Sequence, residues 1–407
     1  MRKKRRHSII QFIKRNYAVF LILCIIVLQN PVWPLWRLPY MPVSFLFCLL
    51  FFIKKNSLKA LSGSRLIALL LMGLAFVVLP VIRGGVHGSN IIYILCFIGA
   101  MTISFKEATL TLEMISKGLA IIVGISLSAW IIHLGIKPLP LLGTIDLTGM
   151  KGNYTVMENY GFFVQNSGAN TFRFYSIFDE PGVLGTLGAY VLYANRYQFS
   201  KWYNLLILLG CLCTLSAAFY ILTIIGIAFT SLGSFRRTLI IIIPLVVIIL
   251  LGYDFIKENE VFNGFVIDRI KNASESLNDR TGAAVSTYYK NMGILEFLFG
   301  IGVPRVEALG LAQGASYKTF IIENGFLSLI ILVYAYWKLN KRVNKEVLVF
   351  VGLFWLSFLQ RPTSFIGWQM LIYACIVTKL AQKGKSRKKK SVKIRGYETK
   401  VSNAVAS

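Results

Sequence analysis

The stretch Leu66–Ile82, LIALLLMGLAFVVLPVI, contains no charged residue and is long enough to cross the hydrocarbon core of a bilayer as one helix. Similar runs recur along the 407-residue chain, which is 56% hydrophobic and only 15% charged. A typical soluble domain has about 25% charged residues. The pattern therefore predicts an all-α, polytopic integral membrane protein. It argues against a disordered chain, a disulfide scaffold and a soluble nucleic-acid-binding protein.

Apolar runs of this kind predict about twelve transmembrane helices. They cover approximately residues 16–30, 41–53, 66–82, 90–105, 118–135, 182–195, 203–216, 217–232, 238–256, 319–337, 346–360 and 364–381. Several are shorter than about 17 residues, so we expect them to extend into their flanks or to lie in a thinner part of the bilayer. The alternative for the pair 203–216 and 217–232 is one long kinked element around Leu215, Ser216 and Ala217.

With twelve spans and a cytoplasmic amino terminus, the net charge of +27 falls on the cytoplasmic side of the membrane. The predicted cytoplasmic segments then hold 31 of the 44 Lys and Arg residues and four of the 17 acids, so the outer face is neutral. Short loops rich in Lys and Arg stay in the cytoplasm. We therefore expect both termini there, with a basic amino terminus over 1–15, one membrane domain over 16–381 and a basic tail over 382–407. We expect this tail to contact anionic lipid head groups and not nucleic acid.

Two predicted extracytoplasmic loops, 136–181 and 257–318, are much longer than the other connections. They hold ten of the outer basic residues together with eleven acids, so they are rich in both signs while the outer face is neutral. Long loops at one face of a helical bundle commonly carry the functional site. We therefore expect a site for polar, partly anionic substrates there.

The first loop ends in Arg173-Phe-Tyr-Ser-Ile-Phe-Asp179-Glu180-Pro181, directly before a span. An acid followed by proline is typical of a helix start, and an ion pair between Arg173 and either acid would be a purely structural explanation. The functional interpretation is that the arginine binds phosphate oxygens. Aromatic faces around it would then suit sugar rings; these residues are Phe172, Phe174, Tyr175 and Phe178.

The motif Arg-Phe-x-Ser-x-Phe-x-Glu-Pro-x-x-x-Gly, here Arg173–Gly185, resembles the signature of Wzy-type polysaccharide repeat-unit polymerases, in the superfamily that includes O-antigen ligases. The resemblance covers about residues 160–340 and implies a GT-C-like fold. It continues with Asp268-Arg269, Asn278-Asp279-Arg280, Leu298–Gly302 and Ile322–Phe326. Ligases typically carry a histidine where this chain has Gly314 or Ala315, and the family's Ser-Arg turn is Ser216-Ala217 here. The missing histidine favours a polymerase.

The resemblance implies an enzyme at the outer face of a bacterial cytoplasmic membrane. It would transfer a growing glycan from polyprenyl pyrophosphate to a hydroxyl of the incoming lipid-linked unit, for O-antigen, capsule or exopolysaccharide. We predict that Arg173, Arg280 and Arg269 bind the pyrophosphate or anionic sugar groups, and that Glu180 or Asp179 positions or deprotonates the acceptor. Arg305 is a further binding candidate, for which a solvated surface position is the alternative.

No cofactor and no metal are expected, because the cysteines lie in apolar runs and the three histidines are scattered. The expected partners are polyprenyl-pyrophosphate-linked oligosaccharides and the lipid bilayer, with flippase and chain-length regulator proteins as candidate protein partners. The alternatives are a ligase-type glycan transferase of the same superfamily and a lipid-linked oligosaccharide flippase. Spans almost free of charged residues argue against the flippase, since transporters usually carry ionisable groups or broken helices near the midplane.

Overall fold

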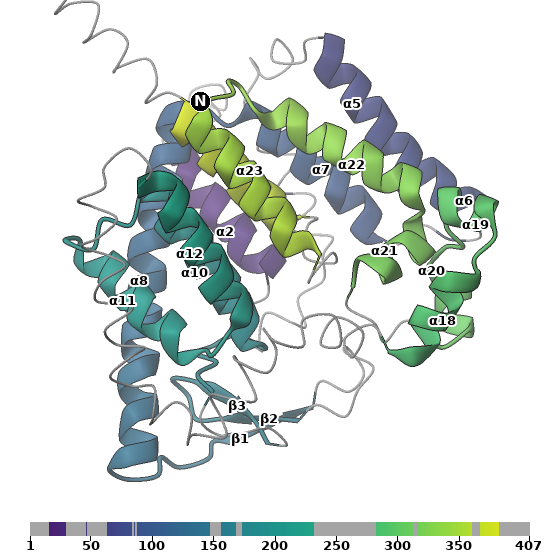
Figure 1. The fold of residues 1–407 in the computed structure, drawn as a ribbon. Coiled ribbons are helices and arrows are strands. Elements are labelled where there is room, and N and C mark those ends of the chain that lie inside the picture. The colour runs from purple at the N-terminus through teal and green to yellow at the C-terminus, as the bar shows by residue number, and fades with distance from the viewer. Residues whose placement is uncertain are drawn as a thin grey trace, which may run out of the picture.

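The computed structural model describes residues 16–29, 46, 63–83, 85, 88–146, 156–167, 173–231, 282–311, 316–359 and 367–381. This part of the chain is mostly helical (Figure 1). The predicted spans 41–53, apart from Leu46, and 238–256 lie outside the described residues, as do the amino-terminal segment 1–15 and the tail 382–407.

Two helices are long and apolar enough to cross a membrane, Gly63–Ile82 and Phe105–Gly135. The first consists of α5 (Gly63–Gly73), the π-helical segment η2 (Leu74–Val78) and α6 (Leu79–Ile82), and the second is α8 (Phe105–Gly135). A third candidate is the pair α21 (Tyr317–Asn324) and α22 (Phe326–Leu339), which meet at a bend of 108°. The prediction of one continuous span over 319–337 therefore missed a break at Gly325, which a hydropathy pattern cannot show.

The other apolar helices are shorter. They are α2 (Tyr17–Gln29), α7 (Gly88–Thr102), α10 (Pro181–Ala194), α11 (Trp202–Cys213), α12 (Ala217–Ser231), α23 (Lys345–Phe358) and the helix Trp368–Ala381. Several apolar helices in a mostly helical chain agree with the predicted class of α-helical membrane protein.

α11 and α12 are two helices and not one kinked element. The chain leaves α11 through Thr214–Ser216, where Leu215 adopts a left-handed conformation with φ 49°. α10 runs antiparallel to α11 and parallel to α12, so the chain reverses its direction at this break. The contacts that show this are Gly188–Cys211 and Asn195–Asn204 for α11, and Gly185–Phe219 and Tyr193–Gly226 for α12.

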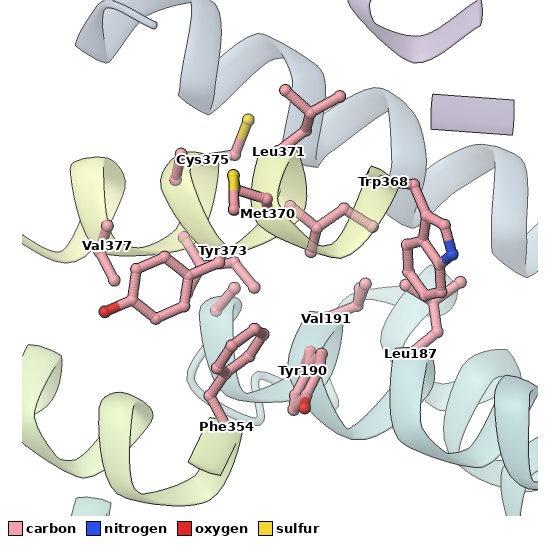
Figure 2. Packing of buried hydrophobic residues seen from close by; sticks show 14 of the residues in the cluster. Leu187, Tyr190, Val191, Phe354, Trp368, Met370, Leu371, Tyr373, Cys375 and Val377 are labelled. Carbon is pink, nitrogen blue, oxygen red and sulfur yellow. The ribbon is translucent and has the colours of Figure 1, made fainter. Parts of the chain in front are cut away.

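The core is formed where α10, α23 and the helix Trp368–Ala381 meet. Figure 2 shows Tyr190, Phe354 and Tyr373 in the space between these helices, with ring centroids 5.6 Å apart for Tyr190 and Phe354 and 4.7 Å for Phe354 and Tyr373. The Tyr190 hydroxyl bonds to Ser357. Nearly every residue of the helix Trp368–Ala381 is buried, which agrees with its lack of a polar face.

The bundle has two ends of different character. At the end that we name the basic end, three segments come together that hold eight Lys and Arg residues and two Glu: Lys106–Lys117, Arg196–Lys201 and Lys338–Lys345. The bonds that join helices there are Asn195 Nδ2 to Ser116 Oγ, Lys379 Nζ to Asn195 Oδ1, Tyr373 Oη to Asn340 Oδ1, and the ion pair between Arg196 and Glu346. This gathering agrees with the sorting of charge in the sequence.

At the opposite end, named the loop end, the described parts of both long loops are folded (Figure 1). The first loop contains an antiparallel sheet of β1 (Gly143–Asp146), β2 (Val156–Asn159) and β3 (Val164–Asn166), in that order. The all-α prediction did not include this sheet. The second loop contains α18 (Ala283–Asn291), α19 (Ile294–Phe299) and α20 (Val303–Ala308), which pack with α21 around a small core of Val285, Ile301, Val306, Leu311 and Ile322.

Candidate functional site

Two consecutive residues of the first loop bind two consecutive carbonyl groups at the end of α11. The backbone N–H of Phe174 donates to the Cys213 carbonyl at 3.0 Å, and Arg173 Nε donates to the Thr214 carbonyl at 3.3 Å. The last carbonyls of a helix have no partner within the helix and carry its negative dipole end. The break between α11 and α12 therefore holds the Arg173 guanidinium.

The aromatic residues around Arg173 anchor the loop. Phe174 is fully buried, 5.6 Å from the Trp130 ring of α8, and Phe178 is buried in the main core. Tyr175 is buried against the sheet. The prediction that these three aromatic faces bind sugar rings is wrong in this structure, because all three side chains are buried in the protein. Burial of a large aromatic ring in the core is a major source of folding free energy. Phe172 lies outside the described residues.

Asp179 and Glu180 mark the start of α10, as the sequence predicts. Glu180 is the N-cap residue with an extended backbone, Pro181 occupies the first turn, and the Val183 N–H donates to the Glu180 carbonyl. The Glu180 side chain makes no capping hydrogen bond. Both acids are half-buried, and the positive end of the α10 dipole favours their negative charge. The helix start thus uses the main chain of Glu180 and not its carboxylate.

Two left-handed residues flank this region, Ser176 with φ 54° and Leu215 with φ 49°. Such backbone costs about 1–3 kcal/mol for a residue other than glycine and gathers at functional sites. Ser176 is also fixed by its neighbours, since Ser176 Oγ donates to Ser126 Oγ at 3.0 Å and its carbonyl accepts from the Val164 N–H. We name Arg173, Asp179, Glu180 and the break Thr214–Ser216 the Arg173 site.

The remaining predicted arginines are not part of the described Arg173 site. Arg305 is exposed on α20 and pairs at 3.5 Å with Glu296, which also accepts from the Tyr288 hydroxyl. An exposed ion pair contributes little stability, and its position agrees with the surface alternative. Arg269 and Arg280 lie outside the described residues.

The two later motifs of the resemblance meet through their main chains. The Ile301 N–H donates to the Ile322 carbonyl at 2.8 Å, and the Gly302 N–H donates to the Glu323 carbonyl at 3.0 Å. Gly300 and Gly325 have φ 77° and 83°, and a Cβ on either would lie within 2.6 Å of backbone atoms of the other segment. This glycine crossing has no room for side chains, which explains the glycines in both motifs.

Arg83 is a site candidate that the sequence analysis did not identify. It follows α6, and its Cβ and Cδ lie against Gly302, 3.1 and 3.5 Å from where a Cβ would be on that glycine. Its Nη2 is buried without a hydrogen-bond partner in the described structure. Burial lowers the pKa of Arg83, but a guanidinium stays charged in proteins. An arginine directly after an apolar span is ordinary in sequence, so no signal distinguished it.

A second missed cluster lies at the end of α8. His133 Nδ1 accepts from the Leu139 N–H at 3.0 Å, and its ring is 4.4 Å from that of Tyr160. The Tyr160 hydroxyl donates to Glu158 at 2.7 Å. Burial and this carboxylate raise the pKa of Tyr160 to about 12, so the phenol stays protonated and keeps the bond. The cluster joins α8 to β2.

Among the described residues, no group of three or more His, Cys, Asp or Glu side chains is placed to hold a metal ion. Comparison of the chain with protein-family models, with curated proteins and with solved structures finds no match in any of the three.

Proposed function

We propose that the chain is a multi-pass glycosyltransferase of the bacterial cytoplasmic membrane that polymerises oligosaccharide repeat units carried on polyprenyl pyrophosphate. About twelve spans with both termini in the cytoplasm place the loop end outside. Two helices long enough to cross a membrane support a membrane location, and the gathering of basic segments at the other end supports this orientation.

The observation that carries the proposal is the Arg173 site. The Arg173 guanidinium is held at the end of α11 by a backbone carbonyl, and two half-buried carboxylates follow at the start of α10. A cation and a carboxylate are what a glycosyl transfer from a lipid pyrophosphate requires. The cation stabilises the departing pyrophosphate, and a carboxylate orients or deprotonates the attacking hydroxyl.

In this mechanism, the acceptor hydroxyl of the incoming unit attacks the anomeric carbon of the growing glycan. The bond from that carbon to the pyrophosphate oxygen breaks, and the lipid pyrophosphate leaves with the electron pair. Glu180 or Asp179 takes the proton of the hydroxyl. Arg173, with Arg280 and Arg269 of the second loop, compensates the charge of the leaving group.

The test is the glycan made in cells that carry Arg173→Ala, Arg280→Ala or Glu180→Gln in place of the wild-type chain. Loss of a cation that stabilises a leaving group lowers the rate by about 100-fold or more, so glycolipids with a single repeat unit should accumulate. Lys290→Ala, at an exposed position of α18, is the matched control and should give wild-type polymer.

Normal polymer in both arginine variants, at wild-type protein levels, would contradict the site. The deletion strain separates the alternatives. Single-unit glycolipids indicate a polymerase, long polymer retained on its carrier lipid indicates a ligase, and absence of outward-facing units indicates a flippase.

A further inference from the structure

The folded parts of the two long loops each carry an exposed group of large apolar side chains. The first group, which we name the sheet patch, has four members that are each more than half exposed: Ile136 78%, Leu141 51%, Leu142 66% and Phe162 58%. The second group, which we name the α19 patch, has three: Ile294 77%, Leu295 68% and Phe299 39%. Apolar side chains gathered on a surface indicate contact with another protein or with a membrane.

The sheet patch is attached to α8. Ile136 directly follows the last residue of that helix. Leu142 Cδ1 lies 3.0 Å from the position that a Cβ would take on Gly161, the residue before Phe162. The Phe162 carbonyl accepts a hydrogen bond from Ser126 Oγ of α8 at 2.7 Å. Figure 1 shows the sheet beside the loop end of α8. The patch therefore has the same height along the bundle as the last turns of this helix.

The charges of α8 indicate where the bilayer lies along it. Glu113 and Lys117 form an exposed ion pair at 2.8 Å, which belongs outside the hydrocarbon. The segment Gly118–Gly135 contains no Asp, Glu, Lys or Arg. Its 18 residues measure about 27 Å at 1.5 Å per residue, close to the hydrocarbon thickness of about 30 Å. With Lys117 at the head groups of one leaflet, the end of α8 reaches those of the other.

The α19 patch lies at the end of the other helix that is long and apolar enough to cross a membrane, which ends with α6. α19 ends at Phe299, three residues before Gly302, and Gly302 lies against Arg83, the residue after α6. The last two residues of α6, Val81 and Ile82, are themselves 59% and 74% exposed. Figure 1 shows α19 beside α6. Exposed apolar side chains therefore occur on both sides of this contact.

Burial within α19 is the reverse of what water favours. The Glu296 side chain is only 33% exposed, and it accepts from the Tyr288 hydroxyl and pairs with Arg305. Ile294 and Leu295, directly before it, are more than two-thirds exposed. A helix on a water-facing surface turns its apolar residues inward and its charged residues outward. The opposite arrangement is favourable when an apolar phase lies against the exposed side.

We propose that the sheet patch and the α19 patch insert into the bilayer leaflet on the loop-end side, so that both long loops are seated in the membrane surface. The bilayer is the occupant because each patch lies at the end of a helix that can cross a membrane, at the level of the head groups. Lys137 is exposed directly after Ile136, where its stem can lie along lipid while its ammonium stays in water. This seating goes beyond the proposed function and does not depend on the reaction.

The experiment measures how fast a membrane-impermeant maleimide labels introduced cysteines in the full-length chain, reconstituted into vesicles of phosphatidylethanolamine and phosphatidylglycerol. Leu142→Cys reports on the sheet patch and Leu295→Cys on the α19 patch. Asp146→Cys on β1 and Lys290→Cys on α18 are the matched controls, because each replaces an exposed charged residue of the same loop. The wild-type chain gives the background from the native cysteines.

Both patch cysteines should react at least about tenfold more slowly than their controls, because an apolar phase raises the pKa of a thiol and each unit lowers the thiolate fraction tenfold. Since each control lies on the same loop as its patch, the orientation of the chain in the vesicle does not affect the ratio. A patch cysteine that reacts as fast as its control would lie in water and would overturn the proposal.

Dilution of the chain in the vesicles distinguishes lipid from the other occupants. Slow labelling that persists at one chain per vesicle supports the bilayer as the occupant. Slow labelling that is lost on dilution would show that a second copy of the chain covers the patch, and it would overturn the proposal. A different protein partner is absent from the vesicles, so a patch that such a partner covers in cells would react like its control.

Discussion

The basic end and the loop end of the bundle are held together by different chemical groups. At the basic end, side chains join the helices: Asn195 bonds to both Ser116 and Asn204, and Arg196 binds Glu346 with two hydrogen bonds of 2.5 and 2.6 Å. At the loop end, side-chain bonds such as Ser126–Ser176 and Arg173–Thr214 are present, but pairs of main-chain groups also join distant segments. Examples are Phe174 to Cys213, Val164 to Ser176 and Ile301 to Ile322.

Four helix starts show the same difference, although α11, which also begins at the basic end, has no side-chain capping bond. At the basic end, α8 has a capping box of Ser104 and Glu107, and Asn344 caps α23. At the loop end, α10 and α21 begin without a side-chain capping bond. A main-chain scaffold fixes the position of a segment without using its side chains. This arrangement suits the ligand site that we propose at this end.

The largest expected effect comes from the main chain of the loop end. Gly300→Ala or Gly325→Ala places a Cβ within 2.6 Å of backbone atoms and forces a conformation that is essentially restricted to glycine. We expect a loss of about 3 kcal/mol or more, measured as a lower melting temperature in detergent. Gly352→Ala on α23, where a Cβ meets no other atom, should be neutral or stabilising by up to about 1 kcal/mol. Equal melting temperatures for all three variants would refute the glycine crossing.

The next-largest effect is expected on the free energy of unfolding when the ion pair of the basic end is removed. Arg196 and Glu346 are each less than a third exposed, so Arg196→Gln should cost about 2 kcal/mol. A double-mutant cycle with Glu346→Gln isolates the pair. The folded variant should still make polymer of wild-type length, unlike Arg173→Ala. Polymer lost in Arg196→Gln at an unchanged melting temperature would show that the basic end acts in the reaction.

The smallest expected effect on stability compares a helix start that has a side-chain capping bond with one that has none. Asn344→Ala removes a bond to the Val347 N–H at 2.9 Å and should cost about 1 kcal/mol. Ser316→Ala at the start of α21 should cost almost nothing, because that serine makes no capping bond and its buried hydroxyl has no partner in the described structure. Thermal unfolding of the two variants in parallel gives the comparison. A greater loss for Ser316→Ala would contradict it.

The sequence predicted much of the described helical scaffold, since hydropathy is a sum over many residues. The spans 66–82, 182–195 and 203–216 appear within a few residues of their predicted limits. The break at Gly325 was missed because it depends on one backbone angle. The three aromatic neighbours of Arg173 were misassigned because a sequence does not show whether an aromatic side chain in a loop is exposed or buried by other segments. Arg83 was missed because its contact with Gly302 joins positions more than two hundred residues apart.

The lengths of the helices have a consequence for the bilayer. α22 has 14 residues and α11 has 12, so they measure about 21 and 18 Å at 1.5 Å per residue. The hydrocarbon of a typical bilayer is about 30 Å thick. We therefore expect the membrane to thin around these helices. If both helices cross the membrane, the floor of the loop end lies below the level of the surrounding head groups.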